Sequence, residues 1–367
     1  MVRLDSIQEQ IKDIEEEIKK TQYNKATQHH IGLLKAKLAR LRDKQEQRGT
    51  KKGKSEGYSV KKSGDATVIL VGFPSVGKST LLTKLTNAES KTAGYAFTTL
   101  TVIPGVMEYQ HAKIQILDVP GILKGAAAGT GRGKEVLSVV RNCDLVIFIL
   151  DVINPEEQYE VLKKELYNFH IRVNSRKPDV KIVKKAKDGL SISSTVKMTR
   201  MDKKTVESIL KEFKITNADV VIRDDITPDE LIDCIEGNKH YVPAITLLNK
   251  TDNATREVVN LLTRKLKAMP ISAKNGIGID DVKEKIFRTL SFIRIFMKEV
   301  GKPADLDVPL IVKEPATIRT VCQSIHKDFV RKFRYAKVWG KSAKFPGQKK
   351  SLHHSVQDGD IVEIHLS

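Results

Sequence analysis

The segment of this chain with the clearest chemistry is the glycine-rich sequence GFPSVGKST at residues 72–80. In its Gly-x4-Gly-Lys-Ser pattern, successive backbone N–H groups and a helix N-terminus hold phosphate oxygens. The lysine of such a loop reaches the outer phosphates, and the serine hydroxyl binds Mg²⁺. We therefore predict a nucleoside triphosphate site with Mg²⁺, formed by Gly72, Phe73, Pro74, Ser75, Val76, Gly77, Lys78, Ser79 and Thr80.

Two later segments indicate which base is bound. A carboxylate such as Asp252 accepts hydrogen bonds from N1–H and the exocyclic amine of guanine, whereas adenine offers neither donor. We expect Asn249 to tie its loop to the phosphate loop, Lys250 to lay its stem along the base, and the N–H of Ala273 to serve guanine O6. The predicted guanine-binding residues are Asn249, Lys250, Thr251, Asp252, Ser272, Ala273 and Lys274.

The segments between these motifs complete the predicted Mg²⁺ and γ-phosphate site. Asp118 ends another predicted strand, which places its carboxylate near the Mg²⁺ water shell and the Gly121 N–H near the γ-phosphate. Thr99 is our chosen Mg²⁺ ligand, with Thr98 as the alternative. The remaining predicted nucleotide contacts are Phe97, Thr98, Thr99, Asp118, Val119, Pro120 and Gly121. The predicted metal ligands are Ser79, Thr99 and, through water, Asp118, and the predicted catalytic residues are Lys78, Thr99 and Gly121.

Ile122 bears on the rate of hydrolysis. Ile122 comes directly after Gly121 and occupies the position at which many signalling GTPases carry the Gln that orients the attacking water. An aliphatic side chain cannot orient water, so we expect slow intrinsic hydrolysis. We expect the water to be positioned in another way: by backbone groups, by a monovalent cation, or by a residue from the segment 125–133 or from a partner. Arg132 is a candidate charge stabiliser, and the competing interpretation is a surface Arg in a loop.

The hydrophobic pattern predicts the elements that position these residues. Apolar runs predict strands at 66–71, 114–118, 145–151 and 242–249. Helical stretches alternate with them, at 79–85, 133–141 and 280–296. This alternation is typical of an α/β core with a mostly parallel, doubly wound sheet.

Three further regions surround that predicted core, which spans residues 65–298. Apolar residues at helical spacing predict a helical hairpin over 1–48, and the polar, Lys-rich stretch 49–64 predicts a basic linker. The separation of the strands ending at 151 and 249 is about twice that of one crossover, so we predict a small α+β insert at about 172–238. The pattern of residues 299–367 predicts a compact half-open sheet domain, with a helix at 318–331 and a strand at 335–339.

Charge indicates what kind of partner to expect. The chain has 64 Lys and Arg against 45 Asp and Glu, a formal charge of +19, which favours binding to polyanions such as a ribosome. Residues 327–350 concentrate this charge, with Phe333, Tyr335 and Trp339 interleaved. Those aromatics are interpreted as core residues of the sheet domain, with base-stacking platforms as the alternative.

Compartment and membrane association are also constrained. Three cysteines without a close pair favour a reducing, cytoplasmic setting. The sequence has no apolar run of transmembrane length, and neither Val2 nor the C-terminal residues fit a lipidation motif, so we expect no membrane association. DNA is not an expected partner.

Four segments together resemble one family. They are GFPSVGKST at 72–80, FTTLTVIPGV at 97–106, LDVPGILKGAAAGTGRG at 117–133 and NKATQHHIGLLKAKLARL at 24–41. The chain resembles the developmentally regulated GTP-binding (DRG) family of Obg-related GTPases over nearly its whole length. This resemblance implies a P-loop GTPase core, an insert similar to the second domain of a small-subunit ribosomal protein, and a β-grasp-like TGS domain at the C-terminus.

The resemblance also implies activity and partners. It implies GTPase activity stimulated by K⁺, association with ribosomes or ribosomal RNA, and a stabilising DRG-family regulatory protein. Ser75 stands where many K⁺-stimulated relatives have Asn, which leaves direct K⁺ ligation at this position open. The predicted function is a slow GTP-hydrolysing switch in translation, and the alternative is a nucleotide-gated assembly scaffold with negligible hydrolysis.

Overall fold

A computed structural model describes residues 2–22, 24, 26–50, 64–86, 103–118, 140 and 142–366. The chain divides into two compact units. Residues 1–57 and 170–241 form the first, which we name the hairpin–insert unit. Residues 58–169 and 242–367 form the second, the core unit. Among the described helices, none has the length and apolar character needed to cross a bilayer.

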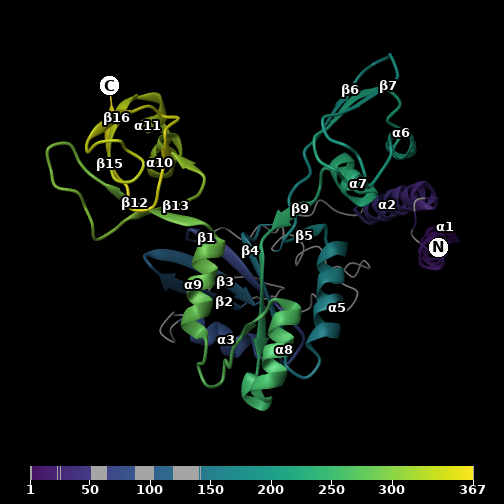
Figure 1. The fold of residues 1–367 in the computed structure, drawn as a ribbon, viewed down its shortest axis with the longest axis horizontal. Helices are drawn as coiled ribbons and strands as arrows, with labels where there is room; N and C mark the ends of the chain where they lie inside the picture. Colours follow the sequence, from purple (N-terminus) through teal and green to yellow (C-terminus); the bar gives the residue numbers. More distant parts are fainter. Residues whose placement is uncertain are drawn as a thin grey trace. The chain divides into compact units, whose positions relative to one another are not determined.

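A six-stranded sheet forms the centre of the core unit (Figure 1), in the order β11-β10-β4-β1-β3-β2. Its neighbouring strands pair in parallel, except that β2 is antiparallel to β3. The strands are β1 (Ala66–Val71), β2 (Ile103–Tyr109), β3 (Ala112–Asp118), β4 (Leu145–Asp151), β10 (Ala244–Asn249) and β11 (Met269–Pro270). β1 and β4 are buried along their whole length, as expected for strands covered on both faces.

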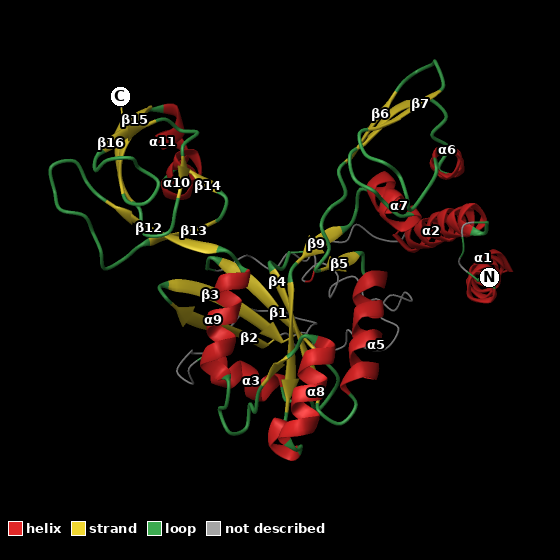
Figure 2. Ribbon diagram, in the orientation of Figure 1, coloured by secondary structure: helices red, strands yellow, loops and turns green. Residues whose placement is uncertain are grey.

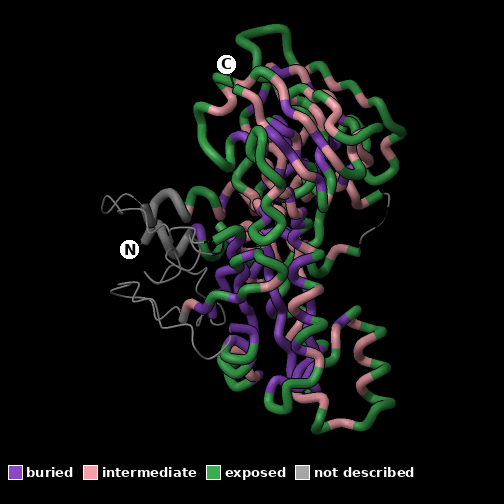
Figure 3. Tube along the Cα trace, turned by 90° about the vertical axis from the view of Figure 1, so that its left-hand side faces the viewer, coloured by how far each residue is buried: buried purple, intermediate pink, exposed green. Residues whose placement is uncertain are grey.

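Helices cover both faces of this sheet (Figure 2). α3 (Lys78–Leu85) and α9 (Ile279–Thr289) share one apolar cluster with the strands, which includes Leu81, Ile147 and Ile286. α5 (Pro155–Asn168) packs against β4 through Tyr159, whose ring contacts Phe148 edge to face at 5.4 Å. α8 (Arg256–Leu266) precedes β11. Figure 3 shows the buried segments running through this sheet.

The C-terminal part of the core unit contains a second sheet, of order β13-β12-β18-β15-β16. Its strands are β12 (Phe292–Met297), β13 (Leu310–Lys313), β15 (Phe333–Trp339), β16 (Gln348–Lys350) and β18 (Ile361–Leu366), with the separate pair β14 (Ala316–Thr317) and β17 (Ser355–Val356). α10 (Ile318–Ile325) and α11 (Lys327–Arg331) follow β14. Val321, Val338 and Val362 lie in the core of this domain.

Several predicted elements differ from the structure. The helix predicted over 280–296 ends at Thr289 in the structure. Two residues later Ser291 adopts a positive φ of 53°, and residues 292–297 form a strand. The predicted strand 242–249 is two strands interrupted at Pro243, because proline has no N–H for the ladder. The predicted helix 318–331 breaks at His326, which is extended. Apart from Val140, the predicted helix 133–141 lies outside the described residues.

The hairpin–insert unit joins two regions that lie far apart in the sequence. α1 (Val2–Lys20) and α2 (Gln28–Thr50) pack through Ile14 and Leu34. The insert has the sheet β6-β8-β7, with helices α6 (Lys203–Glu212) and α7 (Pro228–Glu236). These strands are β6 (Val180–Lys184), β7 (Leu190–Ser194) and β8 (Ala218–Ile222), and a separate pair forms from β5 (Ile171–Val173) and β9 (His240–Val242).

The hairpin helix α2 packs directly on the insert. Ala36 is fully buried in the same cluster as the insert residues Ile209 and Leu231. A Cβ on Gly32 would lie 3.0 Å from Cγ2 of Thr205, so the two helices approach closely at this point. The hairpin helix α2 therefore completes the core of the insert.

Candidate functional site

The predicted site residues gather at one edge of the six-stranded sheet. β1, β3, β4 and β10 all run in the same direction, so their carboxyl ends meet at this edge. Asp118 is paired in register with Leu70, the second-last residue of β1, and Asn249 is paired with Asp151. The topology thus brings the phosphate loop, the end of β3 and the Asn249 segment together.

The phosphate loop is constrained at both of its glycines. A Cβ on Gly72 would lie 2.6 Å from the carbonyl oxygen of Ile149. Gly77 adopts a φ of 95° immediately before α3, and a Cβ there would lie 2.4 Å from Asn249 Nδ2. Val76 is buried at 2% exposure in the sheet core. The loop is therefore fixed to the sheet at both ends, and the N-terminal N–H groups of α3 open into it.

Lys78 lies across this loop. Its Nζ donates hydrogen bonds to the carbonyl oxygens of Gly72, at 3.0 Å, and Phe73, at 2.9 Å. Burial lowers the pKa of Lys78 from its ordinary value, and the nearby Asp118 carboxylate opposes that shift. A half-buried ammonium group held at a helix N-terminus attracts anions such as phosphate.

Ser79 and Asp118 form a pair suited to a hard cation. The Ser79 hydroxyl donates to Asp118 Oδ2 at 3.2 Å. Asp118 is 5% exposed, and its Oδ1 has no hydrogen-bond partner among the described residues. A buried carboxylate oxygen without a partner is costly unless a ligand satisfies it. A hydroxyl beside a buried carboxylate is an oxygen donor set that fits Mg²⁺ with its water shell.

Asn249 connects three segments of the site. Its Nδ2 donates to the Val76 carbonyl at 2.7 Å, and its Oδ1 accepts the Ala273 N–H at 3.0 Å. The side chain is 2% exposed. The hydrogen bond to Val76 joins the Asn249 segment to the phosphate loop, the two segments that we expected Asn249 to connect. The second occupies the N–H that was predicted to serve guanine O6, so base binding there requires this hydrogen bond to be shared or replaced.

The residues predicted to bind guanine, in segments 249–252 and 272–274, are held in place by local contacts. Thr251 donates from its hydroxyl to the Ile271 carbonyl at 2.9 Å, which pins this turn to the segment before Ser272. The Ser272 hydroxyl donates to Asp252 Oδ1 at 2.6 Å. That hydrogen bond is the main cause that lowers the pKa of Asp252, and the charges of Lys274 and Lys250 act in the same direction. Asp252 is exposed and held in its acceptor form, as recognition of guanine requires.

One member of this cluster, Asp151, was not among the predicted site residues. Its Oδ2 accepts a hydrogen bond from Lys250 Nζ at 2.6 Å, and its Oδ1 accepts the N–H of Ile153 at 3.1 Å. Lys250 itself adopts a positive φ of 63°. The available signal was the position of Asp151 at the end of β4, beside the strand that carries Asn249.

Other predicted residues lie outside the described residues. These are Phe97, Thr98, Thr99, Val119, Pro120 and Gly121, together with Ile122 and Arg132. Their predicted roles stay predictions.

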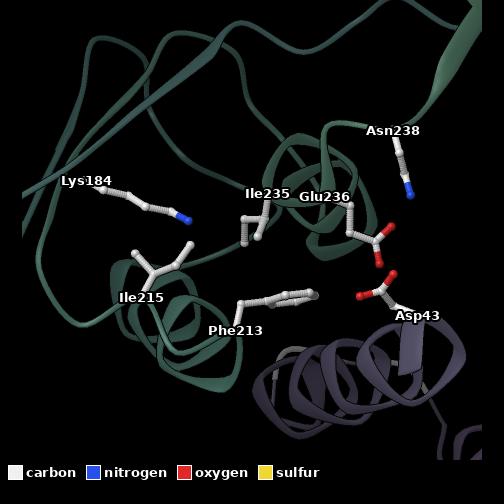
Figure 4. Close-up of a pocket in the computed structure, with 7 residues that line it drawn as sticks. All are labelled: Asp43, Lys184, Phe213, Ile215, Ile235, Glu236 and Asn238. Atoms are coloured by element: carbon white, nitrogen blue, oxygen red, sulfur yellow. The ribbon is translucent and has the colours of Figure 1, made fainter. Parts of the chain in front are cut away.

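A pocket elsewhere contains none of the predicted site residues. It lies in the hairpin–insert unit, where the carboxylates of Asp43 and Glu236 and the ring of Phe213 line it (Figure 4). Lys184, Ile215, Ile235 and Asn238 complete its lining.

Three family models match successive segments of the chain between residues 67 and 366. A model described as a 50S ribosome-binding GTPase matches residues 67–185, and one for the C-terminal region of that domain matches 187–292. A TGS domain model matches residues 293–366.

Relatives over nearly the full length decide the family. Developmentally-regulated G-protein 3 of Arabidopsis thaliana is 45% identical over 365 residues, covering 98% of this chain and 99% of that protein. Developmentally-regulated GTP-binding protein 2 of Homo sapiens is 44% identical over 359 residues, with the same coverage of 98% and 99%. The chain belongs to the developmentally regulated GTP-binding protein family. The family predicted from the sequence is thus confirmed.

Membership establishes the class of the protein. This DRG family member is a GTP-binding protein with a P-loop GTPase fold and a C-terminal TGS domain, as predicted.

An uncharacterized GTP-binding protein of Methanocaldococcus jannaschii is 54% identical over 363 residues, covering 98% of this chain and 92% of that protein. The solved GTP binding protein of Pyrococcus horikoshii is 15% identical, with a TM-score of 0.46 over 82% of this chain and 100% of that one.

Proposed function

We propose that this protein hydrolyses GTP to GDP and phosphate with Mg²⁺, slowly on its own, and acts as a switch on ribosomes in translation. The observation that supports hydrolysis best is the cluster of Lys78, Ser79 and Asp118 at the mouth of the phosphate loop. Lys78 supplies positive charge beside the loop that would hold the phosphates, and Ser79 with Asp118 would hold the metal shell.

The chain's own residues would bind and orient the substrate. The backbone of the phosphate loop and the α3 N-terminus would hold the phosphates, while Lys78 would leave the Gly72 and Phe73 carbonyls for phosphate oxygens. Asn249 would keep the base segment in register with the loop. Bound Mg²⁺ would neutralise charge that develops on the phosphate oxygens. Thr99 and Gly121 would complete the γ-phosphate side.

The ribosomal setting has separate support. The family model that matches residues 67–185 is described as a 50S ribosome-binding GTPase. The formal charge of +19 favours binding to ribosomal RNA. In this setting GTP would order the segments around Thr99 and Gly121, and hydrolysis would release them. A cytoplasmic location, stimulation by K⁺ and a stabilising DRG-family regulatory protein belong to the same proposal.

Phosphate release from GTP is the measurement that tests this proposal. Wild-type protein and Lys78→Ala are compared with and without ribosomes, in KCl and in NaCl. We expect a low basal rate, at least about a tenfold increase with ribosomes, a higher rate in KCl, and a loss of about a hundredfold in Lys78→Ala.

Two outcomes would contradict parts of the proposal. Equal phosphate release by wild-type protein and Lys78→Ala would remove the phosphate loop from catalysis. Tight GTP binding without hydrolysis, even on ribosomes, would favour the nucleotide-gated scaffold instead.

A further inference from the structure

An exposed phenylalanine stands in a basic loop of the TGS domain. Residues 340–347 join β15 to β16, and Phe345 in this loop is 58% exposed. Phe333, Tyr335 and Trp339, which we interpreted from the sequence as core residues with base stacking as the alternative, are half-buried. Phe345 is thus the aromatic side chain that this region presents to solvent.

The rings of the half-buried aromatics are already in contact with other groups. Phe333 packs against the apolar core of the domain. Tyr335 stacks on His365 with ring centroids 4.3 Å apart, and Lys349 Nζ lies 4.7 Å from the Tyr335 centroid. Lys298 Nζ lies 5.1 Å from the Trp339 centroid. These contacts leave Phe345 as the ring best placed to stack on a ligand.

The loop that carries Phe345 is tied down by hydrogen bonds. The Gly347 N–H donates to the Val338 carbonyl at 3.0 Å, and the Lys344 N–H donates to Gln348 Oε1 at 2.9 Å. Gly340 has a φ of 135°, and a Cβ there would lie 2.3 Å from Asp360 Oδ1. Because the backbone is held in place, a ligand that contacts Phe345 orders little additional chain on binding.

Three lysines lie within four residues of Phe345 along the chain. Lys341, Lys344 and Lys349 are exposed, and none of them makes an ion pair within the described part of the chain. Two acidic residues in the turn before β18 have partners. Asp358 pairs with Arg294 at 2.7 Å, and the fully buried Asp360 accepts backbone N–H groups. The three lysines therefore carry positive charge that no carboxylate of the described residues pairs with, and Lys349 also lies over the Tyr335 ring.

We propose that Phe345, together with Lys341, Lys344 and Lys349, is a binding site for single-stranded RNA, in which Phe345 stacks on one unpaired base. Every base has a π face, so such stacking tolerates any sequence, and the lysines bind the flanking phosphates. This inference deepens the proposed ribosomal function by naming the surface that would contact RNA. It does not depend on GTP hydrolysis.

Single-stranded RNA fits this surface better than a membrane does. Stable membrane attachment takes two signals, such as two lipid chains or one chain with a polybasic patch, and a single phenyl ring supplies little buried area. The exposed apolar residues Leu306 and Val308 belong to another loop, together with Asp305 and Asp307, whose charges repel anionic lipid.

The test measures binding of the full-length protein to a fluorescently labelled oligouridylate by anisotropy. We expect Phe345→Ala to weaken binding about tenfold, the effect of losing one base-stacking contact. Leu306→Ala is the matched control, because Leu306 is a similarly exposed apolar residue of the same domain, at 60%. We expect the control to bind within about twofold of wild type.

Salt dependence separates stacking from charge. Lys344→Gln should reduce the slope of log affinity against log salt concentration by about 0.7, the value for one single-strand phosphate contact. Phe345→Ala should leave that slope unchanged, because stacking releases no counterions. A fall in slope for Phe345→Ala would show that the variant had lost the charged surface rather than a stacking contact, and would overturn the proposal.

Other outcomes would also overturn the proposal. They are unchanged RNA affinity in Phe345→Ala, no RNA binding by wild type, or a Phe345-dependent affinity for phosphatidylserine vesicles without one for RNA. Ribosome binding by the same proteins separates this inference from the proposed function. If wild type binds the oligonucleotide through Phe345 but neither binds ribosomes nor is stimulated by them, the ribosomal role fails and the site stands. If ribosomes stimulate hydrolysis and Phe345→Ala binds RNA normally, only this inference fails.

Discussion

Single side chains hold the separate segments of the nucleotide site together. Asn249 is nearly fully buried, and both ends of its amide are hydrogen-bonded, one to the phosphate loop and one to Ala273. Removing this side chain would leave a buried carbonyl and a buried N–H without partners, which costs more than the loss of two exposed hydrogen bonds. The position of this residue therefore governs both the loop and the base segment.

The motifs predicted which residues meet at the site, but not all of their contacts. Gly72 to Ser79 and Asn249 to Asp252 were placed from their residue types, because few side chains suit a phosphate and a guanine. The contact between Asp151 and Lys250 was missed, since it joins residues 99 positions apart and depends on two strands lying side by side. The Ala273 to Asn249 hydrogen bond was missed for the same reason.

Ser272→Ala should change the pH dependence of nucleotide binding. The Ser272 hydroxyl is the main cause that lowers the pKa of Asp252, and guanine needs the charged carboxylate. Without the hydroxyl the pKa rises, so GDP affinity should begin to fall at a higher pH than in wild type. GDP affinity measured from neutral to acidic pH tests this, and identical acid limbs for the two proteins would contradict it.

The N-terminus of α3 is the element on which phosphate binding depends. α3 begins at Lys78 directly after the left-handed Gly77, which is packed against Asn249. This arrangement aims the first N–H groups of the helix into the loop. The sequence predicted it well, because the glycine positions of the motif have a steric cause.

Other elements were harder to predict from periodicity. The segment Phe292-Ile293-Arg294-Ile295-Phe296 continues an apolar pattern that fits both a helix and a strand. The structure ends α9 at Thr289 and uses these residues as β12, which pairs with β13 and β18. These residues form a strand because they pair with strands that are distant in the chain. The local hydrophobic pattern carries no information about those partners.

Gly77→Ala should impair nucleotide binding. An added Cβ would meet Asn249 Nδ2 at 2.4 Å in a backbone conformation that L residues rarely adopt. We expect a loss of about 1–3 kcal/mol in stability of the core unit and at least about tenfold weaker GDP binding. Gly189→Ala is the control, since Gly189 also has a positive φ of 69° but has open space around it. Equal GDP affinity in the two variants would show that the contact with Asn249 is unimportant.

At the scale of the whole molecule, the chain builds two units from four sequence regions. The hairpin was predicted from its apolar pattern and the insert from the separation of the strands that flank it, but neither observation showed that α2 completes the core of the insert. Ala36 of α2 is buried in one apolar cluster with residues of α6 and α7. The described nucleotide-site residues all belong to the core unit.

Ala36→Asp should therefore disrupt one unit and spare the other. A carboxylate at this fully buried position should destabilise the hairpin–insert unit by about 3 kcal/mol or more. Hydrogen exchange in α6 should accelerate, while GDP affinity should stay at the wild-type value. Lys37→Asp introduces the same residue at the neighbouring exposed position and should change neither. Normal exchange in α6 of Ala36→Asp would show that α2 is dispensable for the insert.

The role of Asp252 in base selection is the most direct test of the site as a whole. The measurement is the affinity of wild type and Asp252→Asn for GDP and for xanthosine diphosphate. Wild type should prefer GDP by at least about a hundredfold, because the carboxylate accepts from two guanine donors. Asp252→Asn should bind xanthosine diphosphate more tightly than GDP, since its amide donates where the carboxylate accepted. Unchanged GDP affinity in Asp252→Asn would contradict the assignment of the guanine site.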